Sequence, residues 1–318
     1  MKIGVVGAGQ IVTEFLNASK LIEQIEIEAI CAIDMDERLK ELSEKYHIPK
    51  RFDDFDKMLK NIDADTMYIA VPNHLHFSMA EKSLLAKKNV ILEKPFTITL
   101  QEANQLFEEA EKNQCFIFEA ITTLHSPNYK KAREIVQQMS DIKIVYLNYT
   151  QYSSRYDAFK QNIIFPVFDY KKAGGALRDI NIYNIHFIIG IFGKPKEVKY
   201  YPNIVHNIEV SGTLLLIYEK FVCVLIGAKD CLNNAEIRIQ TDKKTLLSYS
   251  PANAFRDFML IDNNETMRVN LLTVNERLYY ELVEFECVVR ENDIQAYTNY
   301  KQHTLEVMRV VEEAFKNK

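Results

Sequence analysis

The chain has 318 residues, with 39 Lys and Arg against 44 Asp and Glu, so its formal net charge at pH 7 is −5. This acidic balance disfavours nucleic acid or an anionic membrane surface as the main partner. Hydrophobic residues make up 47% and charged residues 26%, which is typical of a soluble globular protein, and the length indicates two domains.

Three features of the sequence bear on location. The five cysteines form no CxxC pair and are odd in number, which is typical of reduced cysteines in a cytosolic protein, and we expect no metal site. The N-terminus enters a predicted strand without a basic segment and a cleavable apolar stretch. The most apolar region, residues 213–228, is interrupted by Glu219 and Lys220, which predicts a hairpin. We therefore expect a cytoplasmic protein with no membrane partner.

Strands alternate with helices over the first 120 residues. The predicted strands span residues 2–6, 26–33, 67–71, 90–92 and 115–118. The predicted helices begin near Ile11 and also cover residues 36–46, about 77–87 and 100–113. This alternation is typical of βαβ units and predicts an α/β Rossmann domain with a doubly wound parallel sheet.

The pattern changes after about residue 120. A predicted helix at residues 128–139 is followed by alternating segments that predict neighbouring antiparallel strands. These segments are residues 143–149, 209–218, 221–228 and 235–240. Amphipathic helices at about 274–290 and 304–315 close the chain. We therefore predict a dinucleotide-binding domain over residues 1–120 and an α+β domain over residues 121–318.

A glycine loop follows the first predicted strand. Gly7 permits a tight turn, and Gly9 permits close approach of the backbone to a pyrophosphate at a helix N-terminus. Val12 replaces the third glycine of the dinucleotide fingerprint. The position between a strand and a helix favours a dinucleotide site over a plain tight turn. The predicted cofactor contacts in this loop are Gly7, Ala8, Gly9, Gln10 and Ile11.

An acidic residue, Asp34, stands at the end of the second predicted strand, 22 residues after Val12. An acid at this place accepts hydrogen bonds from the adenosine ribose and repels a 2′-phosphate, which favours NAD over NADP. Because Asp36 and Glu37 follow it, a solvated loop acid is the alternative. The choice between NAD and NADP therefore stays open.

Polar residues also follow the third predicted strand. Val71 and Pro72 end this strand, and Asn73 and His76 can present donors at the carboxyl edge of the sheet. Asn73 is also suited to cap the next helix.

A lysine stands at the end of the fourth predicted strand, in the tripeptide Glu93-Lys94-Pro95. Because an ammonium group at the mouth of a buried strand is costly to desolvate, we expect that its charge is used there. Ligands of open α/β sheets bind outside the carboxyl ends of the strands. Lys94 is therefore a candidate catalytic residue.

An apolar helix is predicted to begin after Gly174-Gly175 and to run to about Phe192. Asp179, Tyr183 and His186 are spaced i, i+4 and i+7 along it, so they lie on one face. Buried polar side chains of this kind need partners or a wet cavity. From the residues alone, a core tyrosine whose hydroxyl is bonded to Asp179 is favoured over a catalytic one.

Taken together, these motifs resemble the glucose–fructose oxidoreductase/inositol dehydrogenase family (Gfo/Idh/MocA). The resemblance spans nearly the whole chain and rests on Gly7-Ala8-Gly9-Gln10-Ile11, Pro72-Asn73 with His76, Glu93-Lys94-Pro95, Glu119-Ala120 and the run from Gly174 to Tyr183. It implies an N-terminal Rossmann domain and a second domain whose open-faced, mainly antiparallel sheet forms the substrate pocket. It also implies further cofactor contacts from Val71, Pro72, Asn73, His76, Glu93 and Lys94.

The resemblance changes the interpretation of the apolar helix. It implies that Asp179 and Tyr183 face the substrate hydroxyl, as in the tyrosine branch of the family that includes dihydrodiol dehydrogenases. Since a phenol ionises only near pH ~10, a neighbouring Lys94 ammonium would favour the phenolate. Asn181 stands where the motif often has glycine and, like His186, is a candidate substrate contact; His186 is also an alternative proton donor.

These observations predict an NAD- or NADP-dependent oxidoreductase, with NAD slightly favoured. It would transfer a hydride between nicotinamide and a secondary alcohol of a sugar, polyol or diol, with Tyr183, Lys94 and Asp179 handling the proton. Two alternatives are a redox-neutral sugar conversion with tightly bound NAD and a non-catalytic dinucleotide-binding redox sensor. The exposed sheet face predicts a homo-oligomer, either a dimer or a dimer of dimers.

Overall fold

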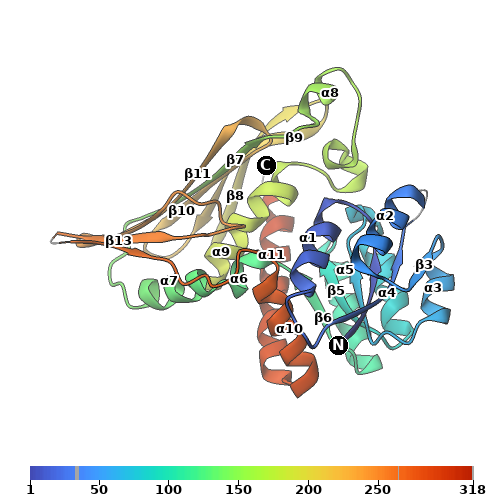
Figure 1. Ribbon diagram of the computed structural model, residues 1–318. Helices are drawn as coiled ribbons and strands as arrows, with labels where there is room; N and C mark the ends of the chain where they lie inside the picture. Colours follow the sequence, from blue (N-terminus) through green and yellow to red (C-terminus); the bar gives the residue numbers. More distant parts are fainter. Residues whose placement is uncertain (33–35, 264, 317–318) are drawn as a thin grey trace. The chain divides into compact units, whose positions relative to one another are not determined.

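The computed structural model describes residues 1–32, 36–263 and 265–316, which form two compact units (Figure 1). The first unit comprises Met1–Ala120 and Val274–Thr304, and the second comprises Ile121–Thr273 and the chain from Leu305 onward. The predicted boundary after residue 120 coincides with the end of the first stretch. Residues 274–304, which the prediction placed in the second domain, belong to the first unit.

The first unit is built on a parallel sheet of six strands in the order β3-β2-β1-β4-β5-β6. The strands are β1 (Lys2–Val6), β2 (Glu26–Cys31), β3 (Lys50–Phe52), β4 (Thr66–Ile69), β5 (Asn89–Glu93) and β6 (Ile117–Ala120). The strand order reverses between β1 and β4, which is where doubly wound sheets bind dinucleotides. The predicted Rossmann architecture is therefore confirmed; the short edge strand β3, which has no apolar run, was not predicted.

Helices connect these strands and cover the sheet. They are α1 (Gln10–Ser19), α2 (Asp36–Tyr46), α3 (Phe55–Asn61), the 3₁₀ turn Asn73–Leu75, α4 (His76–Leu85) and α5 (Leu100–Asn113). Thr99 and Glu102 form a capping box at the start of α5, with each side chain accepting the other residue's backbone N–H. The predicted helices at residues 36–46 and 100–113 are confirmed with the same bounds.

Two helices near the end of the chain complete the first unit. Helix α10 (Tyr279–Glu291) places Phe285 on Phe118 of β6, with the ring centroids 4.5 Å apart. Helix α11 (Ile294–Lys316) begins ten residues before the predicted start at Thr304, and its part from Leu305 onward belongs to the second unit. An amphipathic pattern shows that a helix has an apolar face but not which sheet that face covers, so the return of α10 to β6 was missed.

The second unit contains a sheet of eight strands in the order β14-β13-β12-β11-β7-β10-β9-β8. The strands are β7 (Ile144–Tyr152), β8 (Glu197–Val205), β9 (Ile208–Ile217), β10 (Val222–Ala228), β11 (Asp230–Gln240), β12 (Lys244–Ser248), β13 (Phe258–Asp262) and β14 (Thr266–Val269). All neighbours are antiparallel except β7 and β10, which pair in parallel. The parallel pairing of β7 with β10 was not predicted; the long stretch of chain between them permits a parallel crossover.

One face of this sheet packs on helices. The helices of the second unit are α6 (Thr122–His125), α7 (Pro127–Gln137), α8 (Tyr156–Lys160) and α9 (Ile182–Phe192), together with the last turns of α11 (Figure 1). Alternate strand residues such as Leu147, Leu214 and Leu225 are fully buried in this core. The predicted α+β unit with a mainly antiparallel sheet is confirmed. No helix within the described ranges has the length and apolar character needed to cross a membrane.

Candidate active site

The glycine loop has the geometry of a dinucleotide loop. Gly7 has a φ of +119°, and a Cβ there would lie 2.2 Å from the carbonyl oxygen of Ala70, so only glycine fits. Gly9 caps the N-terminus of α1, and a Cβ on it would meet nothing within 4 Å. The open space therefore adjoins the backbone amides that begin α1, where a pyrophosphate would be favoured. Contacts from Gly7 to Ile11 to the cofactor fit this geometry and stay a prediction.

One residue on α2 bears on the choice between NAD and NADP. Asp34, the predicted ribose acid, is outside the described residues. Arg38 on α2 donates from Nη2 to Thr13 Oγ1 on α1 at 2.8 Å and from Nη1 to Glu41 at 2.6 Å. Thr13 lies about one helical turn after Gly9, and a guanidinium group bonded to it is suited to bind the 2′-phosphate of NADP. The sequence prediction weighed only the acid and missed Arg38.

The imidazole of His76, at the start of α4, links the loops after β4 and β5. It is fully buried, with Nδ1 2.9 Å from the Pro95 carbonyl oxygen and Nε2 3.0 Å from that of Val71. Burial lowers the pKa of His76 below its ordinary value. A neutral imidazole has one N–H, so it donates to only one of the two carbonyls at a time. His76 thus holds two loops together; its contact with cofactor, like that of Pro72 and Asn73, stays a prediction.

Buried carboxyl groups anchor the backbone on both sides of Lys94. Glu93 accepts the Tyr68 hydroxyl at 2.8 Å and the Lys94 amide at 3.2 Å. Glu119 on β6 accepts the Phe96 amide at 3.1 Å and the Thr304 hydroxyl at 2.9 Å. Lys94 itself is half-buried, and its peptide bond to Pro95 is cis. Because both flanks are fixed, Lys94 is presented from a rigid position at the carboxyl edge of the sheet.

A second carboxyl group, Glu281 of α10, is buried near Glu93. Burial raises the pKa of Glu281, and the charge of Glu93 raises it further. Burial also raises the pKa of Glu93, although the hydrogen bond from Tyr68 opposes this. Arg277, whose Nε donates to Glu14 at 2.7 Å, lowers the pKa of both carboxyls. Both buried carboxyls therefore bind a proton more readily than an exposed glutamate does. No sequence pattern pointed to Tyr68 or Glu281 as supports of Lys94.

The predicted helix after Gly174-Gly175 is confirmed as far as Phe192, but it begins differently. Leu177–Asn181 forms a π-helical turn before α9, and such turns are frequent at functional sites. Gly175 has a φ of +113°, and a Cβ on it would lie 2.1 Å from Oε1 of Glu209. The glycine thereby lets the start of this turn approach a buried carboxylate of β9.

The candidate acid and its tyrosine lie at this turn and at the start of α9. Asp179 is in the π-helical turn, and Tyr183 follows it on α9 with 6% of its surface exposed. Oδ2 of Asp179 accepts a hydrogen bond from Lys229 Nζ at 2.6 Å. Lys229, which follows β10, was missed, although it too stands at the end of an apolar strand, which is the signal that singled out Lys94.

The two weaker candidates on this helix are buried. The Asn181 amide donates to the Leu225 carbonyl of β10 at 3.2 Å, and its oxygen accepts from Asn184 at 2.9 Å. His186 is fully buried on α9. These contacts give Asn181 a structural part in joining the helix to β10, and substrate contact by Asn181 or His186 stays a prediction.

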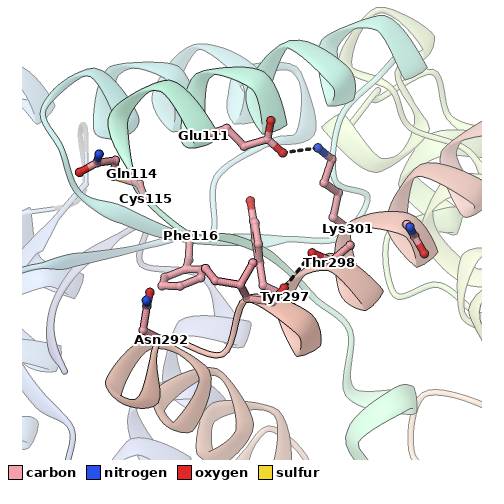
Figure 2. Close-up of a pocket in the computed structure, with 10 residues that line it drawn as sticks. Glu111, Gln114, Cys115, Phe116, Asn292, Tyr297, Thr298 and Lys301 are labelled. Carbon is pink, nitrogen blue, oxygen red and sulfur yellow. Dashed lines mark hydrogen bonds and ion pairs between the residues drawn. The ribbon is translucent and has the colours of Figure 1, made fainter.

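The first unit also contains a cavity of about 760 Å³ (Figure 2). Its wall includes Cys115 and Phe116, just before β6, and Tyr297 of α11, whose ring centroid is 5.0 Å from that of Phe116. Figure 2 shows the Lys301 ammonium paired with Glu111 across it. Because the cavity adjoins the amino end of β6, it is at the sheet edge opposite the strand ends that carry Lys94. Within the described chain, no group of three or more His, Cys, Asp or Glu is placed to hold a metal ion.

Comparison with known proteins identifies the class. Residues 1–121 match the Gfo/Idh/MocA model, described as an oxidoreductase family with an NAD-binding Rossmann fold. Over these residues the chain is similar to the family that the motifs indicated, and the match supports an NAD(P)-dependent oxidoreductase. The open cradle at Gly9 fits such a cofactor.

Particular relatives extend over most of the chain. A scyllo-inositol 2-dehydrogenase (NADP(+)) of Bacillus subtilis is 27% identical over 317 residues, which are 99% of this chain and 96% of that protein. A trans-1,2-dihydrobenzene-1,2-diol dehydrogenase of Sus scrofa is 29% identical over 203 residues, 63% of this chain and 58% of that protein. The structure of a 3-ketoreductase from Actinomadura kijaniata with NADP and TDP-benzene has a TM-score of 0.87 at 18% identity, covering 100% of this chain and 97% of that one, which supports the fold.

Proposed function

We propose that the protein transfers a hydride between nicotinamide and a secondary alcohol of a sugar, polyol or diol. The main support for this proposal is that Asp179 forms an ion pair with buried Lys229. Asp179 stands four residues before Tyr183, and the helix that follows it is otherwise largely apolar. The named activities of the relatives, on an inositol and on a dihydrodiol, support the same substrate class. When bound, the nicotinamide supplies the hydride acceptor or donor.

In this proposal, the residues of the chain control the proton. Tyr183 takes the hydroxyl proton of the alcohol as its C–H bond breaks, so that the carbon becomes a carbonyl. Tyr183 accepts this proton as a phenolate, which the Lys94 ammonium stabilises before the transfer, and it becomes a neutral phenol; Asp179 orients the reacting hydroxyl groups. In the reverse direction the same groups return the proton to the carbonyl oxygen.

A substrate panel tests the activity. Purified protein is mixed with NAD or NADP and a series of inositols, aldoses and trans-diols, and reduction of the nicotinamide is followed by its near-ultraviolet absorbance. We expect turnover with at least one cyclic polyol or diol, and a loss of about 100-fold or more in kcat for Lys94→Ala and for Tyr183→Phe. Wild-type kcat in both variants would reject the proposed proton relay.

The two alternative functions give other outcomes in the same assay. Dinucleotide that co-purifies with the protein, together with substrate conversion but no net absorbance change, indicates a redox-neutral sugar conversion. Tight binding of NAD or NADP without turnover across the whole panel indicates a redox sensor. Retention of Lys94, Asp179 and Tyr183 in one chain favours the dehydrogenase over the sensor.

The choice between NAD and NADP is tested at Arg38. Asp34 favours NAD slightly, whereas the guanidinium of Arg38, held by Thr13, offers a partner for a 2′-phosphate. We expect Arg38→Ala to weaken NADPH about tenfold or more if that phosphate is bound there, while NADH binding stays unchanged. Fluorescence titration with each dinucleotide measures both affinities. Equal effects on the two cofactors would remove Arg38 as the selective group.

We also propose a homodimer, or a dimer of dimers, formed through the sheet face that the core helices leave uncovered. Strand residues on that face, such as Tyr146, Leu215 and Val224, are partly exposed, and Tyr201 is 59% exposed. An apolar sheet face of this kind is typical of a two-fold interface. Light scattering after size-exclusion chromatography should give a dimer or tetramer, and Val224→Lys should shift it towards the monomer. A cytoplasmic location stays a prediction.

A further inference from the structure

We infer that Lys229 is a positioning residue for the reaction, because it holds the Asp179 carboxylate ionised and in a fixed orientation. This inference rests on the proposed role of Asp179 in proton handling. Lys229 follows β10, which is far from Asp179 in sequence, and none of the family motifs quoted above includes it.

The Lys229 ammonium is buried, and its partners include a carboxylate and a backbone carbonyl. The side chain is only 1% exposed, and Nζ donates to Asp179 Oδ2 at 2.6 Å and to the Val167 carbonyl at 2.9 Å. It also lies 4.6 Å from the centroid of the Phe168 ring. Burial of an ammonium is very costly unless it is paired, so the charge of Lys229 requires the charge of Asp179.

The backbone of Lys229 is fixed as firmly as its side chain. Its amide donates to the Val210 carbonyl of β9 at 2.8 Å, and its carbonyl accepts the Ser153 amide at 2.9 Å. With its backbone fixed and two hydrogen bonds from Nζ, Lys229 holds the Asp179 carboxylate in one orientation. Asp179 in turn is 28% exposed, so one side of its carboxylate faces the buried ammonium and the rest remains reachable.

Other charged groups surround this turn, and they bear on its response to pH. Glu209 of β9 is buried with Oε1 against the backbone of Gly175. Arg178, beside Asp179, is also buried, with its guanidinium 4.4 Å from the Phe315 ring centroid on α11. Burial raises the pKa of Tyr200 of β8, and the charge of Glu209 raises it further. Removal of the Lys229 charge would leave Asp179 without this cationic partner at 2.6 Å, and protonation of Asp179 would begin at higher pH.

The test uses the full-length protein and the pH profile of kcat. Lys229→Met should cut kcat at neutral pH tenfold or more and move the acid limb of the profile up by at least one pH unit, with the KM for the dinucleotide unchanged. Lys229→Arg keeps the charge and should retain the wild-type position of the acid limb. Lys143→Met just before β7, where exposed Lys143 pairs with Asp141 at 2.7 Å, is the matched control and should behave as the wild type.

A second pair of variants keeps the test decisive if Lys229→Met folds poorly. Lys229→Met combined with Asp179→Asn removes both charges, so its melting temperature should recover while its kcat remains low. If Asp179→Asn alone keeps wild-type kcat, the proposed function of Asp179 fails. If Asp179→Asn loses activity but folded Lys229→Met keeps wild-type kcat and pH profile, the inference about Lys229 is overturned and the proposed function stands.

Discussion

His76 Nδ1 lies 2.9 Å from the carbonyl oxygen of Pro95, and this contact joins the first turn of α4 to the residue that follows Lys94. A change at His76 is therefore expected to act on catalysis through the Lys94 loop, without any direct part in the chemistry. His76→Ala should lower kcat about 10- to 100-fold by allowing Lys94 to shift, since displacements near 1 Å have effects of that size. Steady-state kinetics on the folded variant measure the loss. His74→Ala, at an exposed position two residues earlier, is the control, and an equal loss in both variants would contradict the argument.

The two glycines of the nucleotide loop should respond differently to the same substitution. Gly7→Ala places a methyl group 2.2 Å from a backbone oxygen at a positive φ, so we expect loss of the fold or a large drop in melting temperature. Gly9→Ala meets open space and should fold normally, but its methyl group should obstruct the pyrophosphate and weaken dinucleotide binding at least about tenfold. Differential scanning fluorimetry and dinucleotide titration separate the two effects. Unchanged affinity in Gly9→Ala would show that the pyrophosphate is bound elsewhere.

The parts of the fold that follow from local pattern were predictable. The strand at Lys2–Val6 and the helices at residues 36–46 and 100–113 have the predicted bounds, because buried strands and amphipathic helices each have a characteristic periodicity. Pairings between distant segments were not predictable in this way. The parallel alignment of β7 with β10, and the packing of α10 on β6, depend on which apolar surfaces meet, and one sequence does not specify that.

The same division holds for the candidate site. Lys94, Asp179 and Tyr183 could be selected because each stands at a predictable place on a strand end or helix face. Their supports could not, because Lys229 and Glu119 are brought to them by the tertiary fold. A lysine after an apolar strand is a usable signal, and applying it to every predicted strand would have added Lys229 to the candidates.

Stability should fall as the pH falls below about 6.5, in part because of His125. Burial lowers the pKa of His125 from its ordinary value of 6.5 to about 3, and the nearby charges of Lys130 and His186 act in the same direction. Below about pH 6.5 the unfolded chain binds a proton that the folded chain refuses, so the unfolding free energy decreases, by about 2 kcal/mol at pH 5 for this residue alone. Chemical denaturation at several pH values measures it.

The prediction for His125 is best checked by difference, since other buried groups titrate as well. His76, whose pKa burial also lowers, contributes in the same direction. Glu93 and Glu281 contribute in the opposite direction, because their pKa values are raised by burial and they stabilise the fold as pH falls. His125→Gln should therefore lose less stability than the wild type between pH 7 and pH 5. Parallel curves for the two proteins would contradict the assignment.

Gly175 should be the least replaceable residue at the start of the candidate helix. Ala at this position adds a methyl group 2.1 Å from Glu209 Oε1 at a φ of +113°. Gly193, at the end of α9, has a φ of +69° but nothing within 4 Å of an added Cβ, so Gly193→Ala isolates the backbone strain, about 1–3 kcal/mol. Gly175→Ala should lower the unfolding free energy by about 1–3 kcal/mol more than Gly193→Ala does, because an overpacked side chain costs that much. Urea denaturation measures both losses. Shortening Glu209 to Ser in the Gly175→Ala background should remove the excess, and if it does not, the carboxylate of Glu209 is not what excludes the methyl group.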